Sequence, residues 1–432
     1  MRQRLRQELS TRLAGRIRDD EDAGRSPMTD AEHRDQARKI LDDVAEEDTR
    51  ARLGRGEDVV SPAVEQQTVA SVLAETLGLG GLEPLLRNPD IENININGDS
   101  VFVRWADGRR ERADPVVGSD AELIQLIRDL AARTGTEERR FDRGSPGVGF
   151  QLTDGERVFA VMAVTSRPSV SIRRHRFKHV TLAQVCKAGS IDRALQSFLG
   201  ATVRARKNLL ITGGTAIGKT TMLRALAAEI PPWERLITIE DVFELGLDAD
   251  VRSHPDVVAM QAREANIEGQ GAISQAELVR WALRMSPDRV IVGEVRGAEV
   301  IPMCNAMSQG NDGSMATLHS STSRGAFTKL AAYAVQGPER LPLEATNLLV
   351  ASALDFVVHL DRPRDGDSRR VVSSVREVVG ADDKQIVSNE VFRPGPDLRA
   401  VPGAPLRAGT LEELIAFGFS HESLTSDEWR RH

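Results

Sequence analysis

One stretch of this chain restricts its fold more than any other: residues 209–221, Leu-Leu-Ile-Thr-Gly-Gly-Thr-Ala-Ile-Gly-Lys-Thr-Thr. An apolar run leads into a glycine-rich loop, and the helix-favouring residues 222–228 follow. The loop has the spacing G-x-x-x-x-G-K-T, and the order strand, loop, helix is the setting in which such a loop binds phosphate. In that setting, backbone amides and the helix N-terminus point at the anion. The stretch predicts a nucleoside triphosphate site, the alternative being a glycine-rich turn without a ligand.

Each part of the loop has an expected task. Gly213 and Gly218 let the backbone curl around an anion. Lys219 would reach the β- and γ-phosphates, and the Thr220 hydroxyl would take a Mg²⁺ position. We therefore expect ATP and Mg²⁺ as ligands, with the nucleotide bound by Gly213, Gly214, Thr215, Ala216, Ile217, Gly218, Lys219, Thr220 and Thr221.

The composition excludes several classes of protein. The formal net charge is −7 and aromatic residues make up 4% of the 432 residues, which argues against a nucleic-acid-binding surface. The two cysteines, Cys186 and Cys304, are too few for a four-cysteine zinc module. No apolar run approaches the roughly 18 residues of a membrane span, and the first residues lack the apolar core of a signal peptide. We expect a cytoplasmic protein that reaches the membrane through partners.

The pattern of apolar residues divides the chain into four parts. Residues 1–60 are rich in charge and predict a partly helical or disordered extension with no core of its own. Residues 61–178 predict a small α+β domain, because a helical segment is followed by strands with alternating polarity. Residues 179–380 alternate helices with continuous apolar strands, which indicates an α/β domain of RecA type, a parallel sheet covered on both faces. Residues 381–432 form a tail without readable chemistry.

Within these parts, individual elements follow from the same patterns. Helices are expected at 30–52, 61–77, 121–133 and 191–204. Residues 177–190 are expected to be a connecting segment. Strands are expected at 91–97, 101–105, 150–152, 157–162, 169–174, 208–212, 235–239, 289–292, 315–318 and 356–360, with an edge hairpin at 371–379 and 385–392.

Residues suited to ATP hydrolysis follow the predicted parallel strands, whose carboxyl ends form the active site in α/β sheets. Glu240 and Asp241 end the second strand, and they either serve Mg²⁺ or cap the next element. Glu294 follows the third strand and is our candidate for orienting the attacking water. His319 follows the fourth and would bond the γ-phosphate, although a structural histidine is the common alternative. Arg296 is expected to be an ion-pair partner of a carboxylate or a phosphate ligand.

Four motifs in order make the sequence resemble the secretion-ATPase superfamily of type II and type IV secretion systems and type IV pili. They are the Walker A loop at 213–221, an Asp box at 237–245, a Walker B stretch at 283–297 and a His box at 313–319. Segments 78–86, 97–98, 152–158 and 171–174 are similar to the tight-adherence pilus branch, the CpaF/TadA ATPases. The resemblance spans roughly residues 63 to 380.

The resemblance implies a homohexamer with ATP between the two domains, and it assigns catalysis to Glu294. Arginines of the N-terminal domain contact the phosphates in the family, and Arg157 and Arg173 match them. It further implies a hexameric motor that powers pilus assembly or protein secretion through an inner-membrane platform. The alternative in the same class is a conjugative or type IV secretion ATPase. Less favoured are a RecA-like nucleic-acid motor and a nucleotide-binding scaffold that barely hydrolyses.

One departure from the family concerns the loop itself. The usual sequence has Gly-Ser where this chain has Ala216-Ile217. Ala216 must adopt the backbone conformation of the glycine, and a β-branched isoleucine disfavours positive φ. We expect nucleotide binding to persist and leave the effect on turnover open.

Overall fold

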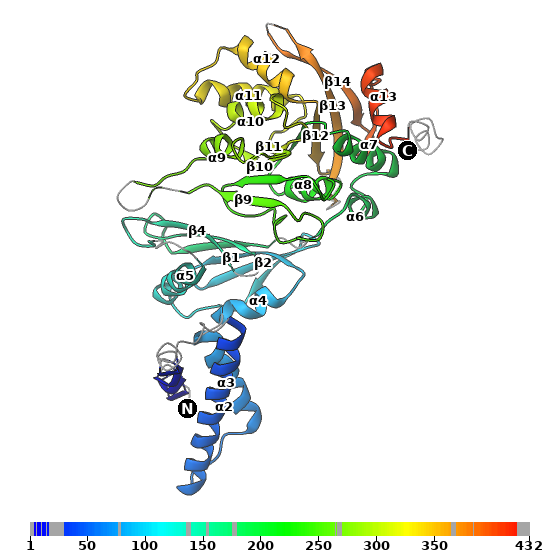
Figure 1. The fold of residues 1–432 in the computed structure, drawn as a ribbon. Helices are drawn as coiled ribbons and strands as arrows, with labels where there is room; N and C mark the ends of the chain where they lie inside the picture. The colour runs from blue at the N-terminus through cyan, green and yellow to red at the C-terminus, as the bar shows by residue number, and fades with distance from the viewer. Residues whose placement is uncertain are drawn as a thin grey trace. The chain divides into compact units, whose positions relative to one another are not determined.

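The computed structural model divides the chain into two compact units, Met1–Arg176 and Phe177–His432 (Figure 1). The structure describes residues 4–5, 7–9, 11–13, 15–16, 30–76, 79–134, 140–152, 155–174, 179–263, 265, 270–363, 369–382 and 384–420.

The first unit begins with helices that share a hydrophobic core. The described residues of 4–16 are helical, and α2 (Asp30–Gly54) and α3 (Pro62–Thr76) follow. Apolar side chains from all three segments are buried together: Leu5, Leu9, Leu13, Ala37, Ile40, Leu41, Val44, Ala45, Val69 and Val72. The expectation of an extension without a core was therefore wrong. Each helix has too few apolar residues to be stable alone, but three stripes with a spacing of three or four residues bury one another.

The rest of the first unit is an antiparallel sheet of six strands in the order β3-β2-β1-β6-β5-β4. The strands alternate between buried and exposed residues, so one face of the sheet packs on the core. The turn residues Thr153 and Asp154, together with Leu77 and Gly78, lie outside the described residues. The elements are η1 (Gly80–Leu82), α4 (Glu83–Arg87), β1 (Ile91–Asn97), β2 (Ser100–Trp105), β3 (Arg110–Ala113), α5 (Asp120–Thr134), β4 (Gly147–Gln151), β5 (Arg157–Val161) and β6 (Ser169–Arg173).

The second unit is built on a sheet of nine strands in the order β15-β14-β13-β12-β7-β11-β10-β8-β9. The six strands from β12 to β9 are parallel, and β13 to β15 extend the sheet with antiparallel pairs. The strands are β7 (Leu209–Gly213), β8 (Leu236–Glu240), β9 (Val257–Gln261), β10 (Arg289–Val295), β11 (Met315–His319), β12 (Phe356–Asp361), β13 (Val371–Ala381), β14 (Ile386–Pro394) and β15 (Ala400–Pro402). This arrangement confirms the predicted fold class, a RecA-like α/β domain with a smaller α+β domain.

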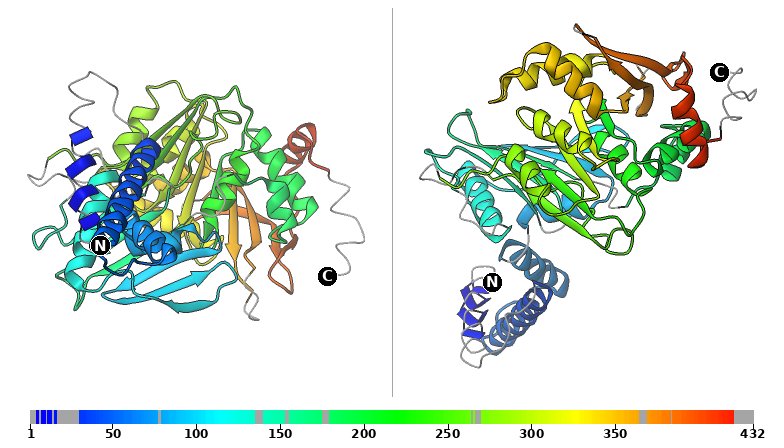
Figure 2. Two further views of the ribbon diagram at one scale, coloured as in Figure 1. Left: turned by 90° about the horizontal axis from the view of Figure 1, so that it is seen from below. Right: turned by 45° about the horizontal axis from the view of Figure 1, so that its top comes forward.

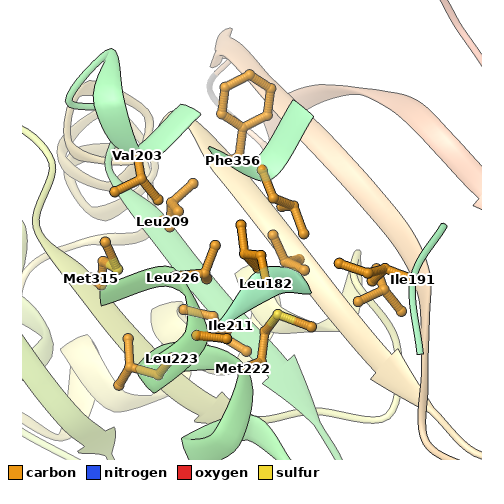
Figure 3. Packing of buried hydrophobic residues seen from close by; sticks show 14 of the residues in the cluster. Leu182, Ile191, Val203, Leu209, Ile211, Met222, Leu223, Leu226, Met315 and Phe356 are labelled. Carbon is orange, nitrogen blue, oxygen red and sulfur yellow. The ribbon is translucent and has the colours of Figure 1, made fainter. Parts of the chain in front are cut away.

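Helices cover both faces of this sheet. On one face lie α6 (Leu182–Lys187), α7 (Arg193–Arg204), α8 (Lys219–Ala227) and α13 (Ala408–Ala416). On the other lie α9 (Gln275–Ala282), α10 (Val300–Ser308), α11 (Gly325–Gln336) and α12 (Leu343–Ala353). Strand β7 serves both cores, because Leu209 and Ile211 pack with the first group and Leu210 with the second (Figure 3). Its five residues are all buried, as expected for a central parallel strand.

The predicted connecting segment is partly helical, and the predicted tail, which we expected to lie outside the domain, belongs to it. The predicted connecting segment contains α6, which begins with a capping box formed by Thr181 and Gln184. The predicted tail supplies β14, β15 and α13, and Leu414 and Phe419 are buried in the first core. In both views of Figure 2 and in Figure 1, α13 lies beside α7. Among the described residues, no helix is both long and apolar enough to span a membrane.

Candidate active site

The loop between β7 and α8 follows the path that its glycines permit. Gly213 and Gly218 have φ values of 150° and 96°. A Cβ on Gly213 would lie 2.7 Å from both the Ile217 side chain and the Leu360 carbonyl oxygen, so only glycine fits there. Ala216 has a φ of 56°, so it does adopt a left-handed conformation that glycine would take more readily.

Ile217 belongs to the core rather than to the phosphate-facing surface of the loop. Its side chain is 7% exposed and is part of the apolar cluster around α8 and β7. The exposed residues at the loop tip are Gly214 and Thr215, and Thr220 and Thr221 are half-buried in the first turn of α8. The two replacements in the loop thus leave its backbone curled and its tip free of large side chains.

Lys219 is the buried cation of the loop, with 7% of its surface exposed. Its Nζ donates to the carbonyl oxygens of Gly214 at 3.0 Å and Gly213 at 3.4 Å. The same Nζ lies 3.0 Å from Nδ1 of His319. The pairing of β11 with β7 explains this contact, because it sets His319 directly opposite Gly213.

Glu294, near the end of β10, is placed between a histidine and an arginine. Its Oε1 lies 2.6 Å from Nε2 of His319, and its Oε2 accepts a hydrogen bond from Arg296. Oε1 is buried, and the His319 ring nitrogen is the polar atom that it contacts. Burial and the neighbouring Lys219 ammonium lower the pKa of His319, so its ring is neutral near pH 7. The site therefore combines a carboxylate, held by a histidine and an arginine, with a neutral imidazole beside the loop.

Glu240 holds the loop that follows β8. Its Oε1 accepts hydrogen bonds from the backbone N–H groups of Glu244 and Leu245, both at 2.9 Å. Burial raises the pKa of this carboxyl to about 7. The neighbouring strand makes room for it, because a Cβ on Gly293 would lie 2.9 Å from Cγ of Glu240. The geometry corresponds to the capping alternative of the sequence analysis.

Arg296 joins the two acidic strand ends. One of its terminal nitrogens lies 2.7 Å from Oδ2 of Asp241, and the other bonds Glu294. Gln275, at the start of α9, donates from Nε2 to Oδ1 of Asp241 at 2.5 Å. Our sequence analysis did not identify Gln275, which is 6% exposed and whose Oε1 accepts no hydrogen bond from the described residues. The capping box at Ser274 was the only local signal, and it predicts a helix start rather than a contact with Asp241.

The structure brings Lys219, Glu294, His319, Arg296 and Asp241 together at one edge of the sheet. Within the described part of the chain, no group of three or more His, Cys, Asp or Glu side chains is arranged to hold a metal ion. Both Asp241 oxygens already have partners, and Thr220 remains the hydroxyl at the helix start. A Mg²⁺ ion would thus depend on Thr220 and on phosphate oxygens for most of its ligands.

Arg157 and Arg173 belong to the first unit, where they occupy directly opposite positions on β5 and β6. Arg173 is also opposite Asn93 on β1. Like charges on directly opposed residues destabilise a sheet unless another group offsets them.

Comparison with known proteins gives a consistent result. Residues 110–389 match the family described as type II/IV secretion system protein. A Mycobacterium tuberculosis protein assigned to conjugal transfer is 35% identical over 305 residues, which are 68% of this chain and 83% of the relative. The type IV secretion system protein VirB11 of Brucella suis is 36% identical over 337 residues, 71% of this chain and 91% of the relative.

A third relative and one solved structure match less of the chain or less closely. The type IV secretion system protein PtlH of Bordetella pertussis is 38% identical over 182 residues, 41% of this chain and 52% of the relative. The crystal structure of the Brucella suis VirB11 ATPase with sulphate aligns with 69% of this chain and 93% of its own, at 27% identity and a TM-score of 0.37.

Proposed function

This chain belongs to the type II/IV secretion system protein family, and on that premise we propose that it hydrolyses ATP to drive a conjugation or type IV secretion machine. One observation carries the proposal: the buried Oε1 of Glu294 lies 2.6 Å from His319, whose ring contacts Lys219 of the loop after β7. Phosphoryl transfer to water needs a group that orients the water and a cation near the phosphates, and Glu294 and Lys219 are suited to these two tasks.

The proposed reaction uses these residues in fixed roles. The amides of residues 214–219 and the Lys219 ammonium bind the phosphates. Glu294 accepts a hydrogen bond from the attacking water and orients it toward the γ-phosphorus. His319 donates to the γ-phosphate, and Arg296 keeps Glu294 and Asp241 in position. The Thr220 hydroxyl would hold Mg²⁺, which would supply charge that stabilises the leaving diphosphate.

We propose a homohexamer for the working assembly, with Arg157 and Arg173 as further phosphate ligands. Their opposed positions on β5 and β6 support this role, since two adjacent guanidinium groups suit a phosphate anion. In this proposal the motor acts at the cytoplasmic face of the inner membrane on a platform protein of the machine.

The names of the relatives support conjugation or type IV secretion over pilus assembly. Of the three relatives named above, one is assigned to conjugal transfer and two to type IV secretion systems. Assembly of a tight-adherence pilus, to which the sequence resemblance points, is therefore the second choice within the same class of motor.

Steady-state hydrolysis by the purified chain tests the proposal. We expect ATP turnover that depends on Mg²⁺, is lost in Glu294→Gln and is unchanged by added DNA. Mass measurement in solution with a non-hydrolysable ATP analogue should give six chains per particle. If neither wild type nor Glu294→Gln hydrolyses ATP although both bind it, the protein is only a nucleotide-binding scaffold. Stimulation by DNA would favour the nucleic-acid motor instead.

A further inference from the structure

The segment directly after His319 touches the phosphate-binding loop. Residues 320–323 connect β11 to the start of α11, and Ser320 donates its backbone N–H to the Gly213 carbonyl at 3.3 Å. Inside the segment, the Ser320 hydroxyl donates to the Thr322 carbonyl at 2.8 Å. We call residues 320–323 the serine segment. Its position fixes the end of the strand that carries His319.

A buried histidine links the serine segment to β7. His359 lies on β12, is 5% exposed, and its Nδ1 is 2.9 Å from the Thr212 hydroxyl. Its ring also forms a hydrogen bond with the backbone of Ser321, and burial lowers its pKa, so the ring is neutral near pH 7. His359 thereby joins the residue before the phosphate-binding loop to the segment that follows His319.

A second group of side chains links the serine segment to the hairpin of β13 and β14. Arg376 donates from Nε to the Ser323 hydroxyl at 2.9 Å, and the hydroxyls of Ser323 and Ser374 are 2.8 Å apart. The Ser374 hydroxyl donates to Oε1 of Glu390 at 2.6 Å, and Arg376 lies 3.2 Å from the same oxygen. The donors thus run in one direction, from Arg376 through Ser323 and Ser374 to Glu390.

Stability alone does not explain why this network of four polar residues lies in a buried position. Ser323 and Ser374 are 4% and 3% exposed, and apolar residues of similar size would be as stable there. Compared with apolar packing, hydrogen bonds hold the groups that they join in a more defined position. The position defined here is that of Ser323, four residues after His319.

We infer that the β13–β14 hairpin positions His319 through Ser374 and the serine segment, which makes Ser374, Arg376 and Glu390 positioning residues for ATP hydrolysis. The inference rests on the proposed function, because it concerns the rate of that reaction. His319 lies between Lys219 and Glu294 with contacts of 3.0 and 2.6 Å. Misplacement of such a group by about 1 Å lowers a rate by about 100-fold, so small shifts of the segment matter.

The experiment compares Ser374→Ala with Ser373→Ala in the full chain. Ser373 is the neighbouring buried serine, and its hydroxyl donates to the His359 carbonyl instead. We expect Ser374→Ala to lower kcat about tenfold while KM for ATP and the Kd of ADP change less than about threefold. We expect Ser373→Ala to keep kcat within about twofold of wild type. A merely structural serine would instead change thermal stability and both nucleotide affinities together with kcat.

Glu390 supplies a second pair of variants at a partly exposed position, for the case that Ser374→Ala unfolds the domain. Glu390→Gln keeps an oxygen that accepts from Ser374, whereas Glu390→Ala removes it. We expect kcat to fall about tenfold in Glu390→Ala and to recover to within about threefold of wild type in Glu390→Gln.

The outcomes separate the two proposals. If wild type hydrolyses ATP and the alanine variants at 374 and 390 do so equally well, the hairpin has no positioning role and the proposed function stands. If kcat, KM and the Kd of ADP all change together, the network is structural only, and the inference is wrong. If wild type is as inactive as Glu294→Gln, the proposed function fails and the inference fails with it.

Discussion

The glycine-rich loop after β7 lies near an acidic edge formed by Asp241, Arg296 and Glu294, but different segments of the chain form the two regions. The loop, residues 213–219, presents backbone amides, and its conformation depends on φ values at Gly213, Ala216 and Gly218. The acidic edge presents side chains, each fixed by another: Gln275 to Asp241, Asp241 to Arg296, Arg296 to Glu294. The loop should therefore tolerate changes of side chain that keep its backbone, whereas the edge should not.

Glu294→Gln is the most severe test of this difference. The amide cannot orient the water as a carboxylate does, so we expect kcat to fall by about 10³-fold, with ATP affinity nearly unchanged because the loop is intact. Single-turnover hydrolysis and a separate binding titration measure the two quantities. An equally large loss of ATP affinity would mean that Glu294 also contributes to binding of ATP before hydrolysis. The proposed difference between the loop and the acidic edge would then be wrong.

The pH dependence of stability tests Glu240, the residue that holds the loop after β8. Its folded pKa of about 7 lies above the ordinary value of 4.5, so the folded protein binds the proton more tightly than the unfolded chain. The resulting stability, up to about 3 kcal/mol, is present below pH 4.5 and is lost as the pH rises through 7. We expect the melting temperature of wild type to fall more between pH 5 and 8 than that of Glu240→Gln. Parallel melting curves for the two proteins would show that the carboxyl is not responsible.

Arg296→Lys tests whether the edge needs a planar group that reaches two carboxylates. A lysine ammonium cannot bridge Asp241 and Glu294 at once, so we expect kcat to fall about tenfold. The control is Arg280→Lys on α9, where a surface pair with Glu339 contributes little. Steady-state kinetics measures kcat of both variants. If Arg296→Lys has the kcat of wild type, a positive charge alone is sufficient at position 296.

Ala216→Gly should have the smallest effect. It removes left-handed strain at an alanine while making the unfolded chain more flexible, for a net gain of about 0.5 kcal/mol in the free energy of unfolding. We expect ATP affinity and kcat to stay within about twofold of wild type, because the backbone is already in place. Denaturant unfolding and ATP titration provide the measurements. A tenfold rise in turnover would show that the loop sequence limits this protein.

The structure of the loop and the contacts of the acidic edge also differ in how well the sequence predicts them. The loop was predictable because its signal is local: consecutive residues encode strand, turn and helix. The strand ends with Glu240, Glu294 and His319 were predictable from the rule that parallel strands present their carboxyl ends together. The contacts among them were not, because Gln275 meets Asp241 across 34 residues of sequence and Ser323 meets Ser374 across 51.

Some elements of the fold were missed for related reasons. Strand β9 has five half-buried residues without alternation, so neither strand pattern marks it. The helices of the first unit gave weak patterns individually, and their shared core appears only when Leu9, Leu41 and Val72 meet. Charge density in residues 1–60 favoured a solvated extension, but charge on the outer faces of helices is compatible with packing within.

The range of residues that matches the family does not coincide with a folding unit, because both sheets include strands outside it. The match starts at residue 110, the first residue of β3, and stops at 389, inside β14. A protein shortened to these limits would lose β1 and β2 and the second half of β14, together with the buried Leu414 and Phe419. Laboratories that truncate the chain by homology alone should expect aggregation, because unpaired strand edges attract other chains.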